Sequence, residues 1–254
     1  MEPIKMKNYR TAIIGILLIV VATFCVAGYY LVPTKRILLQ IYRDRFGNYE
    51  AKNIHTDNKN RNCVWGIDIS HHQKSVNWKV LTEKNRPDFI FLKSTEGSSH
   101  TDSKYREYYK KAKEYQIPVG AYHFFSYQTD GKSQATNFIT HAQLHQGDIY
   151  PVLDVEFRKN MKDKKWIVKQ IKSFCNEIKK EYGVYPIIYC EKDYINRYLG
   201  DDFKEFHFWI SDLYRKPRCN YAIWQYTDRG FVHGIGKVDN NRLNEDISLE
   251  ELKL

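Results

Sequence analysis

The chain has 254 residues, of which 43% are hydrophobic and 15% aromatic, and its formal net charge is +10. This composition excludes an intrinsically disordered chain, because such chains lack the apolar side chains that form a core. The length accommodates one main domain and an appended segment. The positive charge suits an anionic partner, such as a nucleic acid, a membrane surface or an anionic polymer, or serves solubility alone.

The first segment of the chain has the pattern of a membrane anchor. Residues 1–10 carry three Lys or Arg side chains, and residues 11–32 carry no charged side chain. A helix of this length spans roughly 30 Å, the thickness of the hydrocarbon layer of a bilayer. We therefore expect a cytoplasmic N-terminus at 1–10 and a transmembrane anchor at 11–32. The alternative is a signal peptide that is cleaved after a weak site at residues 25–27.

The rest of the chain predicts a linker and one α/β domain. Residues 33–62 are mostly polar and are expected to form a linker or stalk. From residue 63 to 254, short apolar runs alternate with helical patterns. The predicted strands are 64–70, 88–95, 118–125, 150–157, 185–190, 206–213 and 221–227, and the predicted helices are 102–116, 131–145 and 164–183. This order predicts an irregular TIM-like (β/α) barrel with less helix in its second half, preceded by the N-terminal transmembrane helix.

Four cysteines lie beyond the predicted anchor, at Cys63, Cys175, Cys190 and Cys219. Their spacing is not that of a zinc site, and we expect neither a metal nor a cofactor. Disulfides can form if the domain lies outside the cytoplasm, but the sequence does not determine which cysteines would pair. Cys175 lies on the apolar face of the predicted helix 164–183, where a buried free thiol is an equal alternative.

The predicted strands end in polar or aromatic residues. In parallel α/β folds the carboxyl ends of the strands meet at one edge, where the active site lies. If the barrel closes, these residues ring a pocket. They are Asp68, Ser70, Glu96, Tyr122, His123, Asp154, Glu156, Tyr189, Trp209, Asp212, Gln225 and Tyr226.

Two of these carboxylates stand two positions apart in the run YPVLDVEF at residues 150–157. On a strand, Asp154 and Glu156 share a face with their Cα atoms roughly 6.5–7 Å apart, and Val155 and Phe157 point toward the helices. Neighbouring carboxylates repel, so we expect the pKa of one of them to be raised. A protonated acid beside an ionised one is what hydrolysis of a glycosidic bond requires. A solvated edge strand or a divalent cation site is the alternative.

Other chemistry-bearing residues are weaker candidates. His71 and His72 have no zinc-like partner and are expected to be ordinary surface or loop histidines. The basic loop 158–165 is interpreted as a solvated loop, or otherwise as a clamp for acidic groups of a substrate. Trp209 and Trp224 belong to the core or stack on a sugar ring.

Seven motifs occur in an order that resembles glycoside hydrolase family 25, the lysozymes or N-acetylmuramidases that cut peptidoglycan. The resemblance runs from Val64 to Leu243. The motifs are GIDISHHQ with NW (66–73 and 77–78), FLKSTEG (91–97), GAYHFF (120–125), PVLDVE (151–156), PIIYC (186–190), FWISDLY (208–214) and WQYTDRGFVHGIGKVDNN (224–241).

The resemblance implies an irregular β/α barrel that hydrolyses the β-1,4 bond from N-acetylmuramic acid to N-acetylglucosamine. Glu156 then resembles the general acid, Asp154 the carboxylate that supports the reacting sugar, and Asp68 a third acid of the site. Substrate-binding positions along the groove are implied for Glu96, Tyr122, Tyr189, Trp209, Gln225 and Asp239. Whether the reaction retains or inverts configuration, or uses the N-acetyl group of the substrate, depends on a carboxyl separation that the sequence does not give.

Some residues depart from the family pattern. Ser94 stands where Ala is commoner, and Cys190 stands where Thr is usual; neither touches the expected proton chemistry. The loop 158–165 and the N-terminal anchor are not hallmarks of the family. The predicted anchor favours a role in local remodelling of the cell wall over attack on other cells.

The expected partners are peptidoglycan strands, and a membrane through residues 11–32. The catalytic domain is expected to be monomeric and to lie outside the cytoplasmic membrane, or to be secreted if the first segment is cleaved. Nucleic acid is not an expected partner, because the basic residues are scattered and form no recognition motif. Two alternatives are open: a chitinase-like hydrolase of another N-acetylated glycan, and a non-catalytic sugar-binding barrel.

Overall fold

The computed structural model describes residues 63–159 and 161–254. The predicted anchor at 11–32 and the predicted linker at 33–62 lie outside the described residues. Within those described residues, no helix combines the length and the apolar character needed to cross a bilayer.

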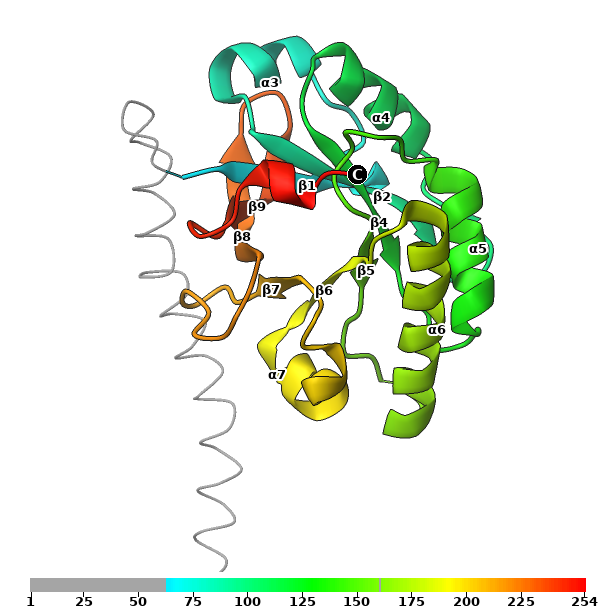
Figure 1. The fold of residues 1–254 in the computed structure, drawn as a ribbon. Coiled ribbons are helices and arrows are strands. Elements are labelled where there is room, and N and C mark those ends of the chain that lie inside the picture. Colours follow the sequence, from blue (N-terminus) through cyan, green and yellow to red (C-terminus); the bar gives the residue numbers. More distant parts are fainter. Residues whose placement is uncertain (1–62, 160) are drawn as a thin grey trace, which may run out of the picture. The chain divides into compact units, whose positions relative to one another are not determined.

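The structure is built around one sheet that closes on itself (Figure 1). Nine strands are hydrogen-bonded in the order β1-β9-β8-β7-β6-β5-β4-β2-β3, and an additional β1–β2 pairing joins eight of them into a barrel. The strands are β1 Trp65–Ile69, β2 Phe89–Glu96, β3 His100–Thr101, β4 Val119–Phe124, β5 Val152–Asp154, β6 Ile187–Glu191, β7 Phe208–Ser211, β8 Ile223–Val232 and β9 Gly236–Leu243.

Helices follow most of the early strands. The α-helices are α3 Trp78–Asn85, α4 Tyr105–Glu114, α5 Gly131–Ala142, α6 Lys164–Tyr182 and the short α7 Lys192–Tyr194; shorter helical turns are His71–Gln73, Ile195–Leu199, Gly200–Phe203 and Leu249–Leu252. In Figure 1 the helices α3 to α7 run around one side of the barrel, and β8 and β9 lie on the other side. The predicted barrel with a helix-poor second half is therefore confirmed.

The strand directions explain this asymmetry. Neighbouring strands are parallel from β1–β2 and β2–β4 through to β7–β8. The β8–β9 and β9–β1 pairs are antiparallel. A parallel connection needs a crossover, usually a helix, whereas β8 and β9 are joined by a tight hairpin. The strand β5 is also shorter than the predicted 150–157, so Glu156 lies in the loop that follows it.

Alternation along the strands divides the apolar residues into two layers. Outward-facing residues such as Ile67, Leu153 and Val155 pack under the helices, as expected for Val155. Inward-facing residues form a separate cluster inside the barrel: Phe89, Phe91, Ile149, Val152, Ile187, Trp209, Ala222, Ile223, Leu243 and Leu252. The interior is thus apolar toward the amino ends of the parallel strands, and the inward positions nearest their carboxyl ends carry polar side chains.

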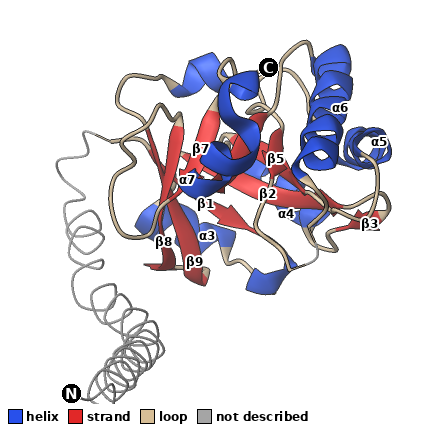
Figure 2. Cartoon of the chain, turned by 90° about the horizontal axis from the view of Figure 1, so that it is seen from below, coloured by secondary structure: helices blue, strands red, loops and turns tan. Residues whose placement is uncertain are grey.

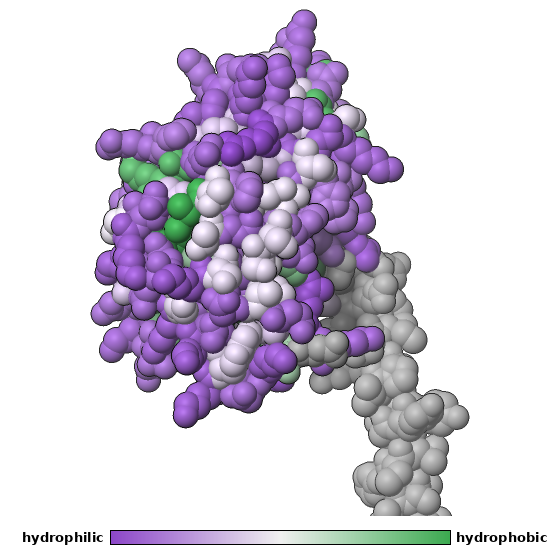
Figure 3. Space-filling model, turned by 90° about the vertical axis from the view of Figure 1, so that its right-hand side faces the viewer, coloured by the Kyte–Doolittle hydropathy of each residue, from purple (hydrophilic) through white to green (hydrophobic). Residues whose placement is uncertain are grey.

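The residues that flank the longest helix, α6, determine where it begins and ends. Asp163 caps the start of α6 by accepting a hydrogen bond from Trp166 N, and Gly183, at φ 77°, ends it in a left-handed conformation. The buried face of α6 is the predicted apolar stripe, including Phe174 and Cys175. Figure 2 shows α5 and α6 side by side, and the outer face of this region is mostly hydrophilic (Figure 3).

The four cysteines of the described residues are free thiols. Cys175 and Cys190 are buried, and Cys63 and Cys219 are partly buried. Burial raises the pKa of the Cys175 thiol and keeps it in its neutral form. The buried-thiol alternative for Cys175 is therefore the one that the structure supports.

Candidate active site

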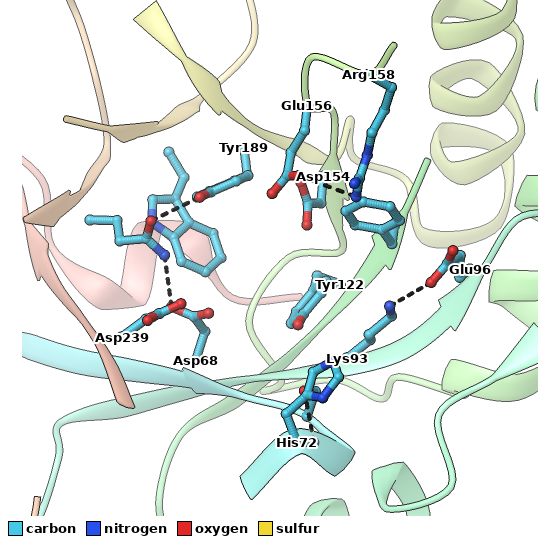
Figure 4. A pocket seen from close by; sticks show the side chains of 14 residues that line it. Asp68, His72, Lys93, Glu96, Tyr122, Asp154, Glu156, Arg158, Tyr189 and Asp239 are labelled. Atoms are coloured by element: carbon cyan, nitrogen blue, oxygen red, sulfur yellow. Dashed lines mark hydrogen bonds and ion pairs between the residues drawn. The ribbon is translucent and has the colours of Figure 1, made fainter. Parts of the chain in front are cut away.

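A cavity of about 350 Å³ opens at the carboxyl ends of the strands (Figure 4). We call it the main cavity. It is lined by Asp68, Ser70, His72, Lys93, Glu96, Tyr122, Phe124, Asp154, Glu156, Arg158, Tyr189, Trp209, Gln225 and Asp239. The nine predicted catalytic and substrate-binding residues are all among them. Three of the predicted strand-end residues do not line it, namely His123, Asp212 and Tyr226. His123 and Tyr226 face the outer layer, where His123 packs on Phe174 and bonds Thr95 and Gln134.

Asp68, on β1, is held in place by two chains of hydrogen bonds. Its Oδ2 accepts from Asn241 Nδ2 at 2.7 Å and from Gln225 Nε2 at 3.2 Å. Asn241 Oδ1 in turn accepts from Trp209 Nε1 at 2.9 Å, and Gln225 Oε1 accepts from the Tyr189 hydroxyl at 2.8 Å. Burial raises the pKa of Asp68 to about 6, although the two amide donors oppose the rise. Four strands thus fix one carboxylate.

Asp154 and Glu156 both point into the main cavity (Figure 4). Asp154 is 8% exposed, and its buried Oδ1 has no hydrogen-bond partner among the described residues. Burial raises the pKa of Asp154 well above its usual range, and the charges of Glu156 and Asp68 raise it further. Burial also raises the pKa of Glu156, against the opposing charge of Arg158. Both carboxyls of the pair are therefore shifted, where the sequence predicted one.

Asp239, on β9, is another of the five acids that line the main cavity. Burial raises its pKa to about 8, and the neighbouring carboxylates Asp68 and Asp228 add to the rise. β9 was not among the predicted strands, although its Asp239 was predicted as a groove residue. In the register of the sheet, Asp239 lies directly opposite Asp68.

The other side of the main cavity carries two cations around one ring. Lys93 Nζ lies 4.7 Å and the Arg158 guanidinium carbon 4.5 Å from the centroid of the Phe124 ring. Lys93 donates to Glu96 Oε2 at 2.6 Å, and Arg158 pairs with Glu156 Oε2 at 3.3 Å. Burial acts to raise the pKa of Glu96, but the hydrogen bond and the charge of Lys93 outweigh it and keep this pKa below its usual value.

Three lining residues were given no place in the site by the sequence. His72 is an exposed histidine of the turn His71–Gln73, as interpreted, but it also lines the main cavity. Lys93 and Phe124 lie within predicted strands and had no assigned role. Arg158 begins the basic loop 158–165, which was interpreted as a solvated loop or otherwise as a clamp for acidic groups of a substrate. The signal that could have found Arg158 is its position two residues after Glu156. Among residues 63–159 and 161–254, no group of three or more His, Cys, Asp or Glu residues is arranged to hold a metal ion.

Comparison with known sequences identifies the family of this site. A family model described as "Glycosyl hydrolases family 25" matches residues 67–235, a range that runs from within β1 to just beyond the end of β8. The chain belongs to this family. It is a glycoside hydrolase, and the resemblance seen in the motifs is confirmed.

Individual relatives agree with the family assignment. The Escherichia coli K12 protein YegX is 32% identical over 199 residues, covering 75% of this chain and 72% of that protein. The family 25 hydrolase is also 28% identical over 186 residues to the autolytic lysozyme of Clostridium acetobutylicum, covering 72% of this chain and 56% of the lysozyme.

Solved structures show the same fold. A family 25 glycosyl hydrolase from Bacillus anthracis superposes with a TM-score of 0.69 at 28% identity, covering 75% of this chain and 94% of the other. A lysozyme from Streptomyces coelicolor superposes with a TM-score of 0.68 at 26% identity, covering 76% of this chain and 96% of the other. The family 25 hydrolase therefore shares the barrel of known lysozymes.

Proposed function

We propose that this family 25 hydrolase is a muramidase, which hydrolyses the β-1,4 bond between N-acetylmuramic acid and N-acetylglucosamine in peptidoglycan. The observation that carries the proposal is the convergence of Asp68, Asp154, Glu156 and Asp239 on the main cavity. The names of its relatives support the choice of substrate, since those of Clostridium acetobutylicum and Streptomyces coelicolor are lysozymes.

Glu156 is the proposed general acid. Its side chain is 38% exposed, so water can return a proton to it after each turnover. Its raised pKa favours the protonated form that donates to the leaving glycosidic oxygen. Because it lies in the loop after β5, at the mouth of the barrel, the scissile bond can approach it from outside.

Asp154 is the proposed partner that supports the reacting sugar. It lies deeper than Glu156, and its Oδ1 has no donor within the described residues. Burial also raises the pKa of Asp154, so its ionised form gains most when a positive charge develops beside it, and glycosidic cleavage develops such a charge on the sugar ring. Asp68 is held by Asn241 and Gln225, so it contributes a fixed negative charge on the opposite wall.

The remaining wall of the main cavity suits a sugar ring. Tyr122, Tyr189 and Trp209 bring aromatic surface, and the Tyr189 and Trp209 rings pack edge to face with centroids 4.9 Å apart. Aromatic surface beside hydrogen-bonding groups is a common way to bind the apolar face of a pyranose. We assign these residues, with Glu96, Gln225 and Asp239, to substrate binding.

The experiment is to digest purified peptidoglycan with the full chain and to identify the sugar at each new reducing end. Muramic acid ends establish the muramidase assignment, and glucosamine ends contradict it. Chitin oligomers serve as the parallel substrate, because release of sugars from chitin but not from wall would favour the chitinase-like alternative. Binding to wall without release of either would favour a non-catalytic barrel.

We further propose that the enzyme acts outside the cytoplasmic membrane, held there by residues 11–32. The support is the uncharged stretch in the sequence, preceded by basic residues. Sequencing the N-terminus of the mature protein tests this proposal. A mature chain that begins near residue 28 would indicate a cleaved signal and a secreted enzyme.

A further inference from the structure

A second hollow of about 560 Å³ adjoins the main cavity. It shares three lining residues with the main cavity, namely Glu96, Phe124 and Arg158, so the two spaces meet at these side chains. The second hollow is otherwise formed by the loops that follow β4 and β5: Phe125, Ser126, Tyr127, Gln128, Phe157 and Lys159. Apart from Glu96, which also lines the main cavity, none of these residues has a role in the proposed cleavage of the glycan chain.

The walls of the second hollow are firmly built. Phe125 and Tyr127 are buried, and their rings pack edge to face with centroids 5.3 Å apart. The Tyr127 hydroxyl donates to the backbone oxygen of Glu156 at 2.8 Å and contacts the Tyr194 hydroxyl at 2.8 Å. Tyr127, in the wall of this hollow, is therefore hydrogen-bonded to the backbone of the proposed general acid.

Arg158 lines both spaces. Figure 4 shows it beside Glu156 at the edge of the main cavity. Its guanidinium stacks on the Phe124 ring and pairs with Glu156 Oε2 at 3.3 Å. Both side chains of this pair are partly exposed, at 50% for Arg158 and 38% for Glu156. A guanidinium in such a position keeps donors free for a second carboxylate, because it carries five N–H groups in a planar fork.

The charge of the second hollow favours an anion. Lys159 adds a second cation to its rim. Lys162 follows in the same loop, and Lys164 and Lys165 begin α6. The acid of this loop, Asp163, is occupied as the cap of α6. The acid of the second hollow, Glu96, already accepts a hydrogen bond from Lys93. An occupant with a carboxylate and an apolar body would match these cations and aromatic walls.

We propose that the second hollow binds the anionic arm of a muramic acid residue, with Arg158 taking its carboxylate. This inference rests on the proposed function, because only a glycan that contains muramic acid carries a lactyl group or a peptide at this point. Arg158 is then a specificity-determining residue that separates muramic acid strands from uncharged glycans such as chitin.

The test compares three substrates with the full chain, scored as kcat/KM from newly formed reducing ends. The first is glycan strands with their peptides, and the second is strands from which an amidase has removed the peptides to leave free lactyl carboxylates. The third is the stripped strands with those carboxylates converted to neutral methylamides. We expect the neutral strands to be cleaved about tenfold more slowly than charged ones, the effect of one lost charge-assisted hydrogen bond.

Arg158→Gln should abolish this preference, and Arg158→Lys should retain part of it. The ratio between substrates is the deciding quantity, because any effect of the variant on Glu156 acts on all three substrates alike. Lys165→Gln is the matched control, since it removes one exposed charge from the same basic stretch without lining either space, and its ratio should equal that of the wild type. Thermal melting of each variant confirms that it is folded.

The outcomes separate the inference from the function on which it rests. If the wild type cleaves all three substrates equally, or if Arg158→Gln keeps the preference for charged strands, the second hollow does not bind the anionic arm. The muramidase assignment would still stand. If no muramic acid substrate is cleaved, the proposed function itself fails. If Arg158→Gln lowers kcat/KM only for the stripped strands, the ligand of Arg158 is the lactyl carboxylate. If it lowers kcat/KM only for the intact strands, the ligand is a peptide carboxylate.

Discussion

Asn241 on β9 donates a hydrogen bond of 2.7 Å to the carboxylate of Asp68 on β1, although 173 positions separate the two residues in the chain. The bond lies across the antiparallel β1–β9 pair, which joins the first and last strands of the described residues. A contact between these two strands and the positioning of one site acid are thus the same interaction. Damage to this contact should therefore appear in stability as well as in activity.

Asn241→Ala tests this link. Asn241 is fully buried, and its loss would leave Trp209 Nε1 without its acceptor and Asp68 without its shorter amide donor. We expect the free energy of unfolding to fall by about 1–3 kcal/mol, the cost of buried polar groups without partners. Urea denaturation measures this change. Asn244→Ala, which removes a part-buried bond to the Tyr221 carbonyl, is the control and should cost less, and equal losses would contradict the prediction.

Asp239 should make the stability of the protein depend on pH. Its pKa is raised from 3.8 to about 8 on folding, chiefly by burial, so the folded state holds its proton more tightly than the unfolded state. The free energy of unfolding should therefore decrease as the pH rises from about 4 toward about 8. Asp239→Asn removes this proton, and its stability relative to the wild type should increase across that range. Denaturation at both ends of the range checks this, and a difference independent of pH would contradict it.

Asp154→Asn separates a charged role for Asp154 from a neutral one. Asparagine keeps the size and hydrogen-bonding pattern of a protonated carboxyl but cannot carry a negative charge. If the ionised form supports the reacting sugar, the variant should lose about 10²–10³-fold in kcat, as expected for loss of a preorganised electrostatic group. The fold should survive, because Asp154 Oδ1 has no partner among the described residues to lose. Near wild-type turnover would show that the charge at this position is dispensable.

Gly131 should tolerate no side chain. It begins α5 at the contact with α6, and a Cβ at this position would lie 1.9 Å from the backbone oxygen of Gln170. Backbone atoms of a packed helix cannot move aside as a flexible side chain can, so Gly131→Ala should cost about 1–3 kcal/mol or more. Lys132→Ala, at the exposed next position, is the matched control and should be close to neutral. A thermal melt distinguishes the two, and equal melting temperatures would contradict the packing described for α5 and α6.

Much of the site could be predicted because its residues follow local rules. Asp68, Tyr122, Asp154 and Tyr189 are inward-facing residues near the carboxyl ends of apolar strands, and alternation alone assigns their faces. The motifs then gave these residues roles by resemblance. The helices 131–145 and 164–183 were found because their apolar stripes are long enough to show the helical period.

The elements that were missed lack such local signals. β9 contains Lys237, Asp239, Asn240, Asn241 and Arg242, so it does not read as an apolar strand. Its buried Asn241 is stabilised by Asp68 and Trp209, which are distant in sequence. Helix α3 buries only Trp78 and Leu81, too few residues for a clear stripe. The place of Arg158 depends on the Phe124 ring, a tertiary contact that no periodicity encodes.

The most direct test of the account is the activity of Glu156→Gln on purified peptidoglycan and on an aryl glycoside with a good leaving group. Loss of a general acid should reduce cleavage of the wall by about 10²–10⁴-fold with an unchanged melting temperature. The aryl glycoside should lose much less, because its leaving group departs without a proton. Wall cleavage by the folded variant at the wild-type rate would contradict the assignment of Glu156 as the proton donor.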